Sequence, residues 1–182
     1  MKLLKVLSCC LLASVLAFGT AFVGIGNVEV DAPGTIEVIG DAGSPQTFVF
    51  NKWQFTKASI PDGKVENIQA EIEINISSLS TGWKELEKNV KKKKDYFYVK
   101  KFPKAKVTID KATALGDGRY QTEAMLSLKK HTKPVLLTFT ISDEAPYEVE
   151  GEGVIMRRKW GFNGNGPKNE VPVKFKAVLP IE

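Results

Sequence analysis

Apolar and polar residues alternate along most of the chain beyond its N-terminal segment, which is the period of a β-strand with one buried face. The clearest example is 68–76, where Ile and Ala alternate with Gln, Glu and Asn. The same period marks the segments 35–40, 48–57, 104–113, 120–128, 135–141, 147–156 and 171–179. The pattern therefore predicts about eight strands, separated by turn residues at fairly even intervals.

Two places in this pattern call for a local interpretation. Within 48–57, Phe48 and Phe50 share one parity whereas Trp53 and Phe55 share the other, which predicts a β-bulge near Asn51. The polar stretch 129–134 is expected to be a turn between two strands.

One segment has the period of a helix instead. Trp83, Leu86 and Val90 recur at the spacing of a single helix face, which predicts a helix over 83–94. Ser80 or Thr81 is the expected N-cap. This helix would be inserted between the strands 68–76 and 104–113.

The helix leads into a dense aromatic corner, 95–103, that ends at a proline. Tyr96, Phe97, Tyr98 and Phe102 fall within these few residues, so their rings need a pocket. Two interpretations stay open: the rings fill the end of an ordinary core, or they line a space for a ligand.

An antiparallel sheet this long normally closes or folds over to protect its edges, so we expect an all-β, eight-stranded antiparallel barrel with one inserted α-helix. A barrel of this size encloses enough space for side chains or for one slender ligand. Small residues, if they point inward, would leave room for a ligand: Ala70, Ala105, Ala124, Ala177, Gly151 and Gly153.

The N-terminal segment has the composition of a secretory signal peptide, with Lys2 and Lys5 followed by an uncharged run over 6–26. We expect a signal peptide over 1–21 and one domain over 22–182, in the periplasm or secreted. An uncleaved N-terminal anchor is the alternative. Both cysteines lie inside this segment, so no disulfide is expected in the processed protein.

The formal net charge of +5 is unevenly placed. A lysine run, 91–94, is followed closely by Lys100, Lys101, Lys104 and Lys106. This patch is either a solvated helix end or a surface that meets anionic lipid headgroups or a partner. Nucleic acid is disfavoured, because export and the lack of interleaved arginine and aromatic residues argue against it.

Catalytic groups are scarce in the sequence. The only histidine, His131, lies in the polar stretch 129–134, so neither a metal site nor a Ser-His-Asp triad is expected. Glu71 and Glu73 share a water-facing strand face, which lacks the burial that would separate the pKa values of an acid–base pair. We therefore expect the protein not to be an enzyme.

Several pieces of sequence occur in a characteristic order: SSLSTG before the helix, DYFYVKKFPKAKVTI at the corner, LSLKKHTKPVLL, and GEGVIMRRKWGF. In this order they resemble the YceI-like family of exported lipid-binding proteins. The resemblance implies a lipocalin-like barrel, extended by a helix, whose interior holds a polyisoprenoid or isoprenoid quinone, with no other cofactor. Family members often have a histidine where this chain has Lys129, with His131 two places later.

Together these observations predict a non-catalytic protein that carries or sequesters a long apolar lipid. The expected lining residues are aromatic: Phe97, Phe102, Trp53, Phe55, Phe139, Trp160 and Phe162. Lys100, Lys101 and Arg157 are expected to meet a headgroup at the mouth. The alternative is a filled barrel without a ligand that acts as an envelope stress or interaction module. A homodimer also stays open.

Overall fold

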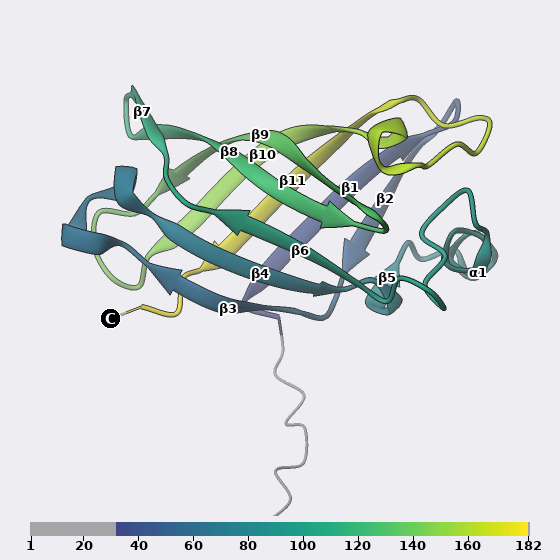
Figure 1. Ribbon diagram of the computed structural model, residues 1–182, viewed down its shortest axis with the longest axis horizontal. Helices are drawn as coiled ribbons and strands as arrows, with labels where there is room; N and C mark the ends of the chain where they lie inside the picture. The colour runs from purple at the N-terminus through teal and green to yellow at the C-terminus, as the bar shows by residue number, and fades with distance from the viewer. Residues whose placement is uncertain (1–31, 182) are drawn as a thin grey trace, which may run out of the picture.

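The computed structural model describes residues 32–181, drawn in colour in Figure 1. The expected signal peptide over 1–21 and the start of the domain at residue 22 lie outside the described residues. The strands are β1 (Gly34–Asp41), β2 (Pro45–Phe50), β3 (Trp53–Ser59), β4 (Gln69–Asn75), β5 (Leu79–Ser80), β6 (Lys104–Ile109), β7 (Thr113–Gly116), β8 (Arg119–Leu128), β9 (His131–Ile141), β10 (Glu148–Met156) and β11 (Glu170–Val178).

Helical segments fill some of the connections. The α-helix is α1 (Lys84–Lys92), and the short 3-10 segments are η1 (Pro61–Gly63), η2 (Val65–Asn67), η3 (Ile76–Ser78) and η4 (Arg157–Trp160). No helix within residues 32–181 has the length and apolar character needed to cross a membrane.

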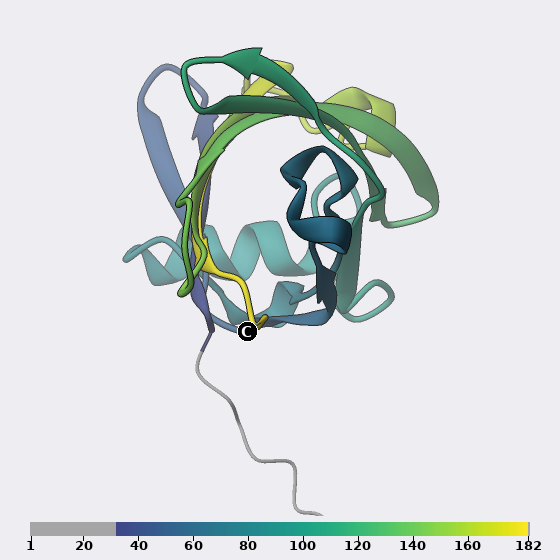
Figure 2. The same ribbon diagram turned by 90° about the vertical axis from the view of Figure 1, so that its left-hand side faces the viewer.

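All the strands belong to one antiparallel sheet, in the order β3-β4-β6-β8-β9-β10-β11-β1-β2-β5, with β7 paired to β8. The sheet curls around a central axis, and α1 crosses one of its ends (Figures 1 and 2). Since β3 and β5 are its two edges, the curled sheet is a half-barrel. The predicted all-β antiparallel, lipocalin-like fold with one inserted helix is confirmed.

The sheet has eleven strands rather than about eight, partly because the predicted strand 48–57 is two strands. β2 ends at Phe50 and pairs with β1 and β5, whereas β3 begins at Trp53 and pairs with β4. The switch of parity near Asn51 is therefore a change of strand, and the predicted bulge there is wrong. The irregularity of register lies further on, between Phe55 and Lys57.

The side chain of Asn51 stabilises this change of strand. Its Nδ2 donates to the carbonyl of Ser78 at 2.9 Å and to Oγ of Ser80 at 3.0 Å. The short strands β5 and β7 account for the remaining difference in strand number.

The turn between β8 and β9 is tighter than predicted. It consists of Lys129 and Lys130, and Lys129 has a positive φ of 56°. His131 already pairs with Leu128, and Pro134 pairs with Met125, so the stretch predicted as a turn from 129 to 134 is mostly strand.

The helix is shorter than predicted, and its N-cap residue is Trp83, which makes no side-chain cap. Thr81 helps instead: its N–H donates to Oε1 of Glu87 at 2.8 Å, and its Oγ1 accepts from the N–H of Trp83 at 3.1 Å. Val90 is buried and Leu86 half-buried, but Trp83 is 55% exposed. The inward helix face therefore includes Leu86 and Val90 without Trp83.

Candidate functional site

The curled sheet encloses a cavity of about 470 Å³. Its wall consists mainly of the inward side chains that the alternating pattern predicted, such as Ile72, Ile74 and Ile76 from the β4 region and Leu126 and Leu128 from β8. Because the strand period is two, each strand turns every second side chain toward this space.

Small residues account for part of this space. Ala70, Ala105, Ala124 and Ala177 line the cavity, as the sequence predicted. Two glycines act differently and are not part of its wall. A Cβ at Gly151 would collide with the ring of Phe175, and a Cβ at Gly153 would lie 2.6 Å from Cδ2 of Leu137. Both glycines face inward, because their paired residues line the cavity, but the space beside them is occupied by Phe175 and Leu137.

One end of the cavity is apolar. A buried cluster consists of Ile68, Ala112, Phe139, Val149 and Leu179, with Val65 of η2 and Ile181 near the C-terminus packed against it. The C-terminus lies at the end of the molecule opposite α1 (Figure 1). The rings of Phe139 and Tyr120 stack there with their centroids 5.7 Å apart. This end of the cavity offers a ligand mainly hydrocarbon contacts.

The other end of the cavity is polar. The polar and charged lining residues come from the β1–β2 hairpin, from α1 and the residues just after it, and from η4 and the loop that follows it: Asp41, Ser44, Gln46, Asn89, Lys93, Tyr96, Arg157 and Asn165. These segments lie together at the α1 end of the molecule (Figure 1). We call this set the polar rim.

Three phenylalanines pack beside the polar rim. The ring of Phe97 is edge-on to Phe162, with centroids 5.0 Å apart, and edge-on to Phe50, with centroids 6.0 Å apart. The aromatic corner reaches this position by folding back on α1: the N–H of Phe97 donates to the carbonyl of Val90 at 3.1 Å. All three rings line the cavity.

Arg157 organises the loop between η4 and β11. It is buried, and its guanidinium donates to four backbone carbonyls: Lys168 at 2.9 Å, Gly164 at 2.9 Å, Pro167 at 2.6 Å, and Phe162. Burial lowers the pKa of Arg157 below its ordinary value. Since a guanidinium has five N–H donors, this loop occupies most of them.

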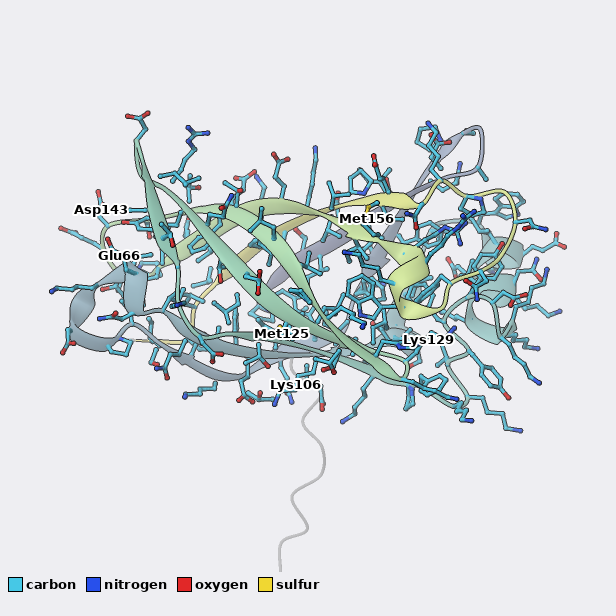
Figure 3. The ribbon with its side chains drawn as sticks, turned by 45° about the horizontal axis from the view of Figure 1, so that its top comes forward. Glu66, Lys106, Met125, Lys129, Asp143 and Met156 are labelled. Carbon is cyan, nitrogen blue, oxygen red and sulfur yellow. The ribbon has the colours of Figure 1, made fainter. Side chains whose placement is uncertain are left out.

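Lys129 connects three segments at the same end of the molecule (Figure 3). Its ammonium donates to the carbonyls of Lys94 at 2.9 Å and Gly161 at 3.0 Å, and it lies 4.8 Å from the ring centroid of Phe162. Burial lowers the pKa of Lys129, and the nearby Asp95 opposes that shift. Sequence reasoning noted this position only as a departure from the family pattern.

An ion pair joins the two loops of the polar rim. Nζ of Lys168 lies 2.6 Å from Oδ2 of Asp41, and the N–H of Lys168 donates to the carbonyl of Asp41 at 2.7 Å. The hydrogen bond from Lys168 holds the pKa of the Asp41 carboxyl below its usual value. The ion pair thus links the β1–β2 hairpin to the loop that follows η4.

Most of the predicted site residues lie in the cavity wall. These are Trp53, Phe55, Phe97, Phe139, Trp160, Phe162 and Arg157. Phe102 does not line the cavity, so its predicted lining position is wrong: it packs edge-on to Tyr98, with centroids 6.3 Å apart. Lys100 and Lys101 are exposed and also lie outside the wall. Contact of any of these residues with a ligand stays a prediction.

Two buried tryptophans differ in their hydrogen bonding. Nε1 of Trp160 donates to the carbonyl of Leu126 at 3.1 Å, which fixes η4 against β8. Nε1 of Trp53 is buried and has no hydrogen-bond partner among the described residues. Sequence reasoning missed the contribution of β1 and β2 to the wall, which includes Ile36 and Phe48.

A curled antiparallel sheet around an apolar cavity, with polar groups at one end only, places this protein in the lipocalin-like structural class. Sequence comparison defines the family: the model of the YceI-like domain matches residues 30–179, so the chain belongs to the YceI-like family. A UPF0312 protein of Photorhabdus laumondii is 33% identical over 113 residues, which are 59% of this chain and 52% of the relative. The chain therefore matches about half the length of that curated relative.

Solved structures show the same fold. BcnA of Burkholderia cenocepacia has a TM-score of 0.73 at 20% identity, covering 80% of this chain and 95% of that one. A polyisoprenoid binding domain from Saccharophagus degradans, implicated in plant cell wall breakdown, has a TM-score of 0.62 at 13% identity, covering 82% of this chain and 94% of that one.

Proposed function

We propose that this protein is a non-catalytic carrier or sequestering protein that takes a long, slender apolar chain into its cavity. The observation that carries the proposal is the cavity of about 470 Å³, apolar along its length and polar only at the α1 end. This volume is within the range of small-molecule sites. A tail that leaves water for such a wall gains about 25 cal/mol for each Å² of apolar surface buried.

The proposed ligand is a polyisoprenoid or an isoprenoid quinone. The structural likeness to a domain named for polyisoprenoid binding supports this class. The tail would lie toward Phe139 and Leu179, and the headgroup would lie at the polar rim near Asn89 and Asn165. Headgroup contact through Lys100 and Lys101 stays a prediction, and these exposed side chains lie outside the wall.

Export to the periplasm or the cell exterior is part of the same proposal. It is supported by the signal-peptide composition of 1–21. The N-terminal residue of protein recovered from the producing cell would test it, since cleavage predicts a new N-terminus close to residue 22.

Ligand binding is tested on protein purified from its own cell envelope. Native mass spectrometry followed by organic extraction should show a long-chain lipid that leaves with the protein. Ligand-free protein should then take up a fluorescent polyprenyl probe. Absence of a co-purifying lipid, together with no probe uptake, would contradict the carrier and favour a filled interaction module.

A further inference from the structure

The outward face of α1 is rich in lysine. Lys84, Lys88 and Lys92 are exposed and recur every four residues, so they lie on one side of the helix, with Lys91 beside them. The opposite side carries Leu86, Asn89 and Val90, which line the cavity. The lysine side therefore points away from the cavity. We call these four residues the lysine face.

Two acids share the helix with these lysines: Glu85 is exposed three residues before Lys88, and Glu87 accepts from the N–H of Thr81. No carboxylate of residues 32–181 forms an ion pair with any of the four. Like charges at this helical spacing repel one another and destabilise the helix. The helix carries four lysines against two glutamates, so this surface has a net positive charge that favours an anionic partner.

An exposed tryptophan adjoins the lysine face. Trp83 directly precedes α1 and is 55% exposed, whereas Trp53 and Trp160 are buried. A second aromatic group follows the helix, where Tyr98 and Phe102 pack together and Nζ of Lys101 lies 5.7 Å from the ring centroid of Phe102. Exposed tryptophan beside lysine is typical of surfaces that lie at a membrane interface.

Charge is distributed unequally between the two ends of the molecule. Glu66 and Asp143 lie at the end opposite α1, and Lys129 lies at the α1 end (Figure 3). Further acids fall in the turns at the Glu66 end: Asp62 in η1, Asp117 in the β7–β8 turn, and Glu144 between β9 and β10. A molecule with this asymmetry turns its lysine-rich end toward an anionic surface before contact.

We propose that the lysine face and Trp83 dock this protein on a membrane that contains anionic lipids. Docking through this face brings the α1 end of the molecule, where the polar rim lies, close to the bilayer. The transfer of an apolar chain from bilayer to cavity rests on the proposed function, whereas docking itself does not. Each lysine near an anionic surface contributes about fivefold to the affinity.

The test compares vesicles of phosphatidylcholine alone with vesicles that also contain phosphatidylglycerol. The full chain should bind only the second kind, and binding should fall as salt is added. Replacing Lys88→Gln and Lys92→Gln together should weaken binding about 25-fold. The matched control replaces Lys64→Gln and Lys111→Gln, two exposed lysines in the η1–η2 and β6–β7 connections, which meet at Glu66, and should leave binding nearly unchanged.

A second readout reports on Trp83. Brominated lipids should quench the tryptophan fluorescence of docked protein, and Trp83→Phe should remove this quenching, because Trp53 and Trp160 are buried. Equal binding to both kinds of vesicle, or equal loss in the two double variants, would overturn the proposal. So would binding to a DNA duplex without binding to the anionic vesicles.

Membrane docking and ligand uptake can be tested separately by supplying the probe either in vesicles or in detergent micelles. Lys88→Gln with Lys92→Gln should slow uptake of a fluorescent polyprenyl probe from anionic vesicles but not from detergent micelles. Uptake from neither source by the unaltered chain would overturn the carrier while leaving docking to be judged by the vesicle experiment. Equal slowing from both sources would overturn the role of the lysine face in transfer.

Discussion

The ring of Phe97 is edge-on to the ring of Phe162, with centroids 5.0 Å apart and planes at 81°. The pair joins the corner that follows α1 to the loop that follows η4, across the edge of the cavity. An aromatic pair in this geometry contributes about 0.5–1.5 kcal/mol beyond its burial. The two segments are therefore coupled where the cavity meets the polar rim, and both rings are exposed to the enclosed space.

Replacing Phe97→Asp should abolish ligand uptake while leaving the sheet folded. The carboxylate would stand in an apolar wall and would oppose entry of an apolar chain, because an unpaired charge is costly away from water. We expect uptake of a fluorescent polyprenyl probe to fall at least about tenfold. Val154→Asp, on the outer wall where Val154 is 49% exposed, is the matched control. Unchanged uptake in Phe97→Asp would mean that the corner serves packing alone.

Replacing Ala124→Leu should shorten the ligand that the cavity accepts. Ala124 is fully buried and lines the cavity, so a larger side chain would occupy space that the ligand needs. Overpacking costs about 1–3 kcal/mol in a filled core, and less where a cavity absorbs the volume. Affinities for a series of prenyl probes should fall for long chains and persist for short ones. Ala114→Leu on exposed β7 should leave the series unchanged.

Replacing Arg157→Met should destabilise the loop between η4 and β11. Four carbonyls would lose a charged donor, and a hydrogen bond to a charged group contributes about 1.5–3 kcal/mol. Part of this loss is offset, because the variant no longer buries a charged side chain. We expect a loss of about 2–3 kcal/mol in the free energy of unfolding. Denaturant titration gives this value, and Arg158→Met, at an exposed neighbour, should stay near the unaltered protein.

The ion pair between Asp41 and Lys168 should break as the pH falls. The pKa of Asp41 is lowered in the folded state by the hydrogen bond from Lys168, so the contribution of the pair is present above the unfolded pKa of about 3.9. That contribution is lost as the pH falls through the lowered folded value. NMR titration of the Asp41 carboxyl should give a midpoint below about 3.9, and Lys168→Gln should raise it. An identical midpoint in both proteins would show that the pair does not form in solution.

The sequence alone predicts the wall of the cavity well, because strand alternation sets which side chains point inward. Ile72, Ile74 and Ile76 were expected on one face, and all three line the cavity. Phe102 shows the limit of this reasoning. It lies in an irregular corner with no period to follow, where Tyr98 has a positive φ of 50°.

Long-range contacts account for what the sequence could not predict. Arg157 was expected to meet a headgroup, but its guanidinium donates to four backbone carbonyls. These carbonyls lie between five and eleven residues further along the chain, and no sequence pattern predicts such pairs. Asn51 similarly fixes the change from β2 to β3 through Ser78 and Ser80, distant in the sequence. Alternation identifies the strands, whereas partners of this kind depend on how the strands are arranged.

Arg157 holds the loop between η4 and β11 through backbone carbonyls only, so the side chains of that loop are not needed for these bonds. Asn165 lines the cavity and its side chain accepts none of these hydrogen bonds, so replacing it changes the polar rim while the backbone bonds to Arg157 are kept. If the proposed carrier function holds, ligand preference can change here through point substitutions on an unchanged backbone, and directed evolution for other ligands should begin at Asn165.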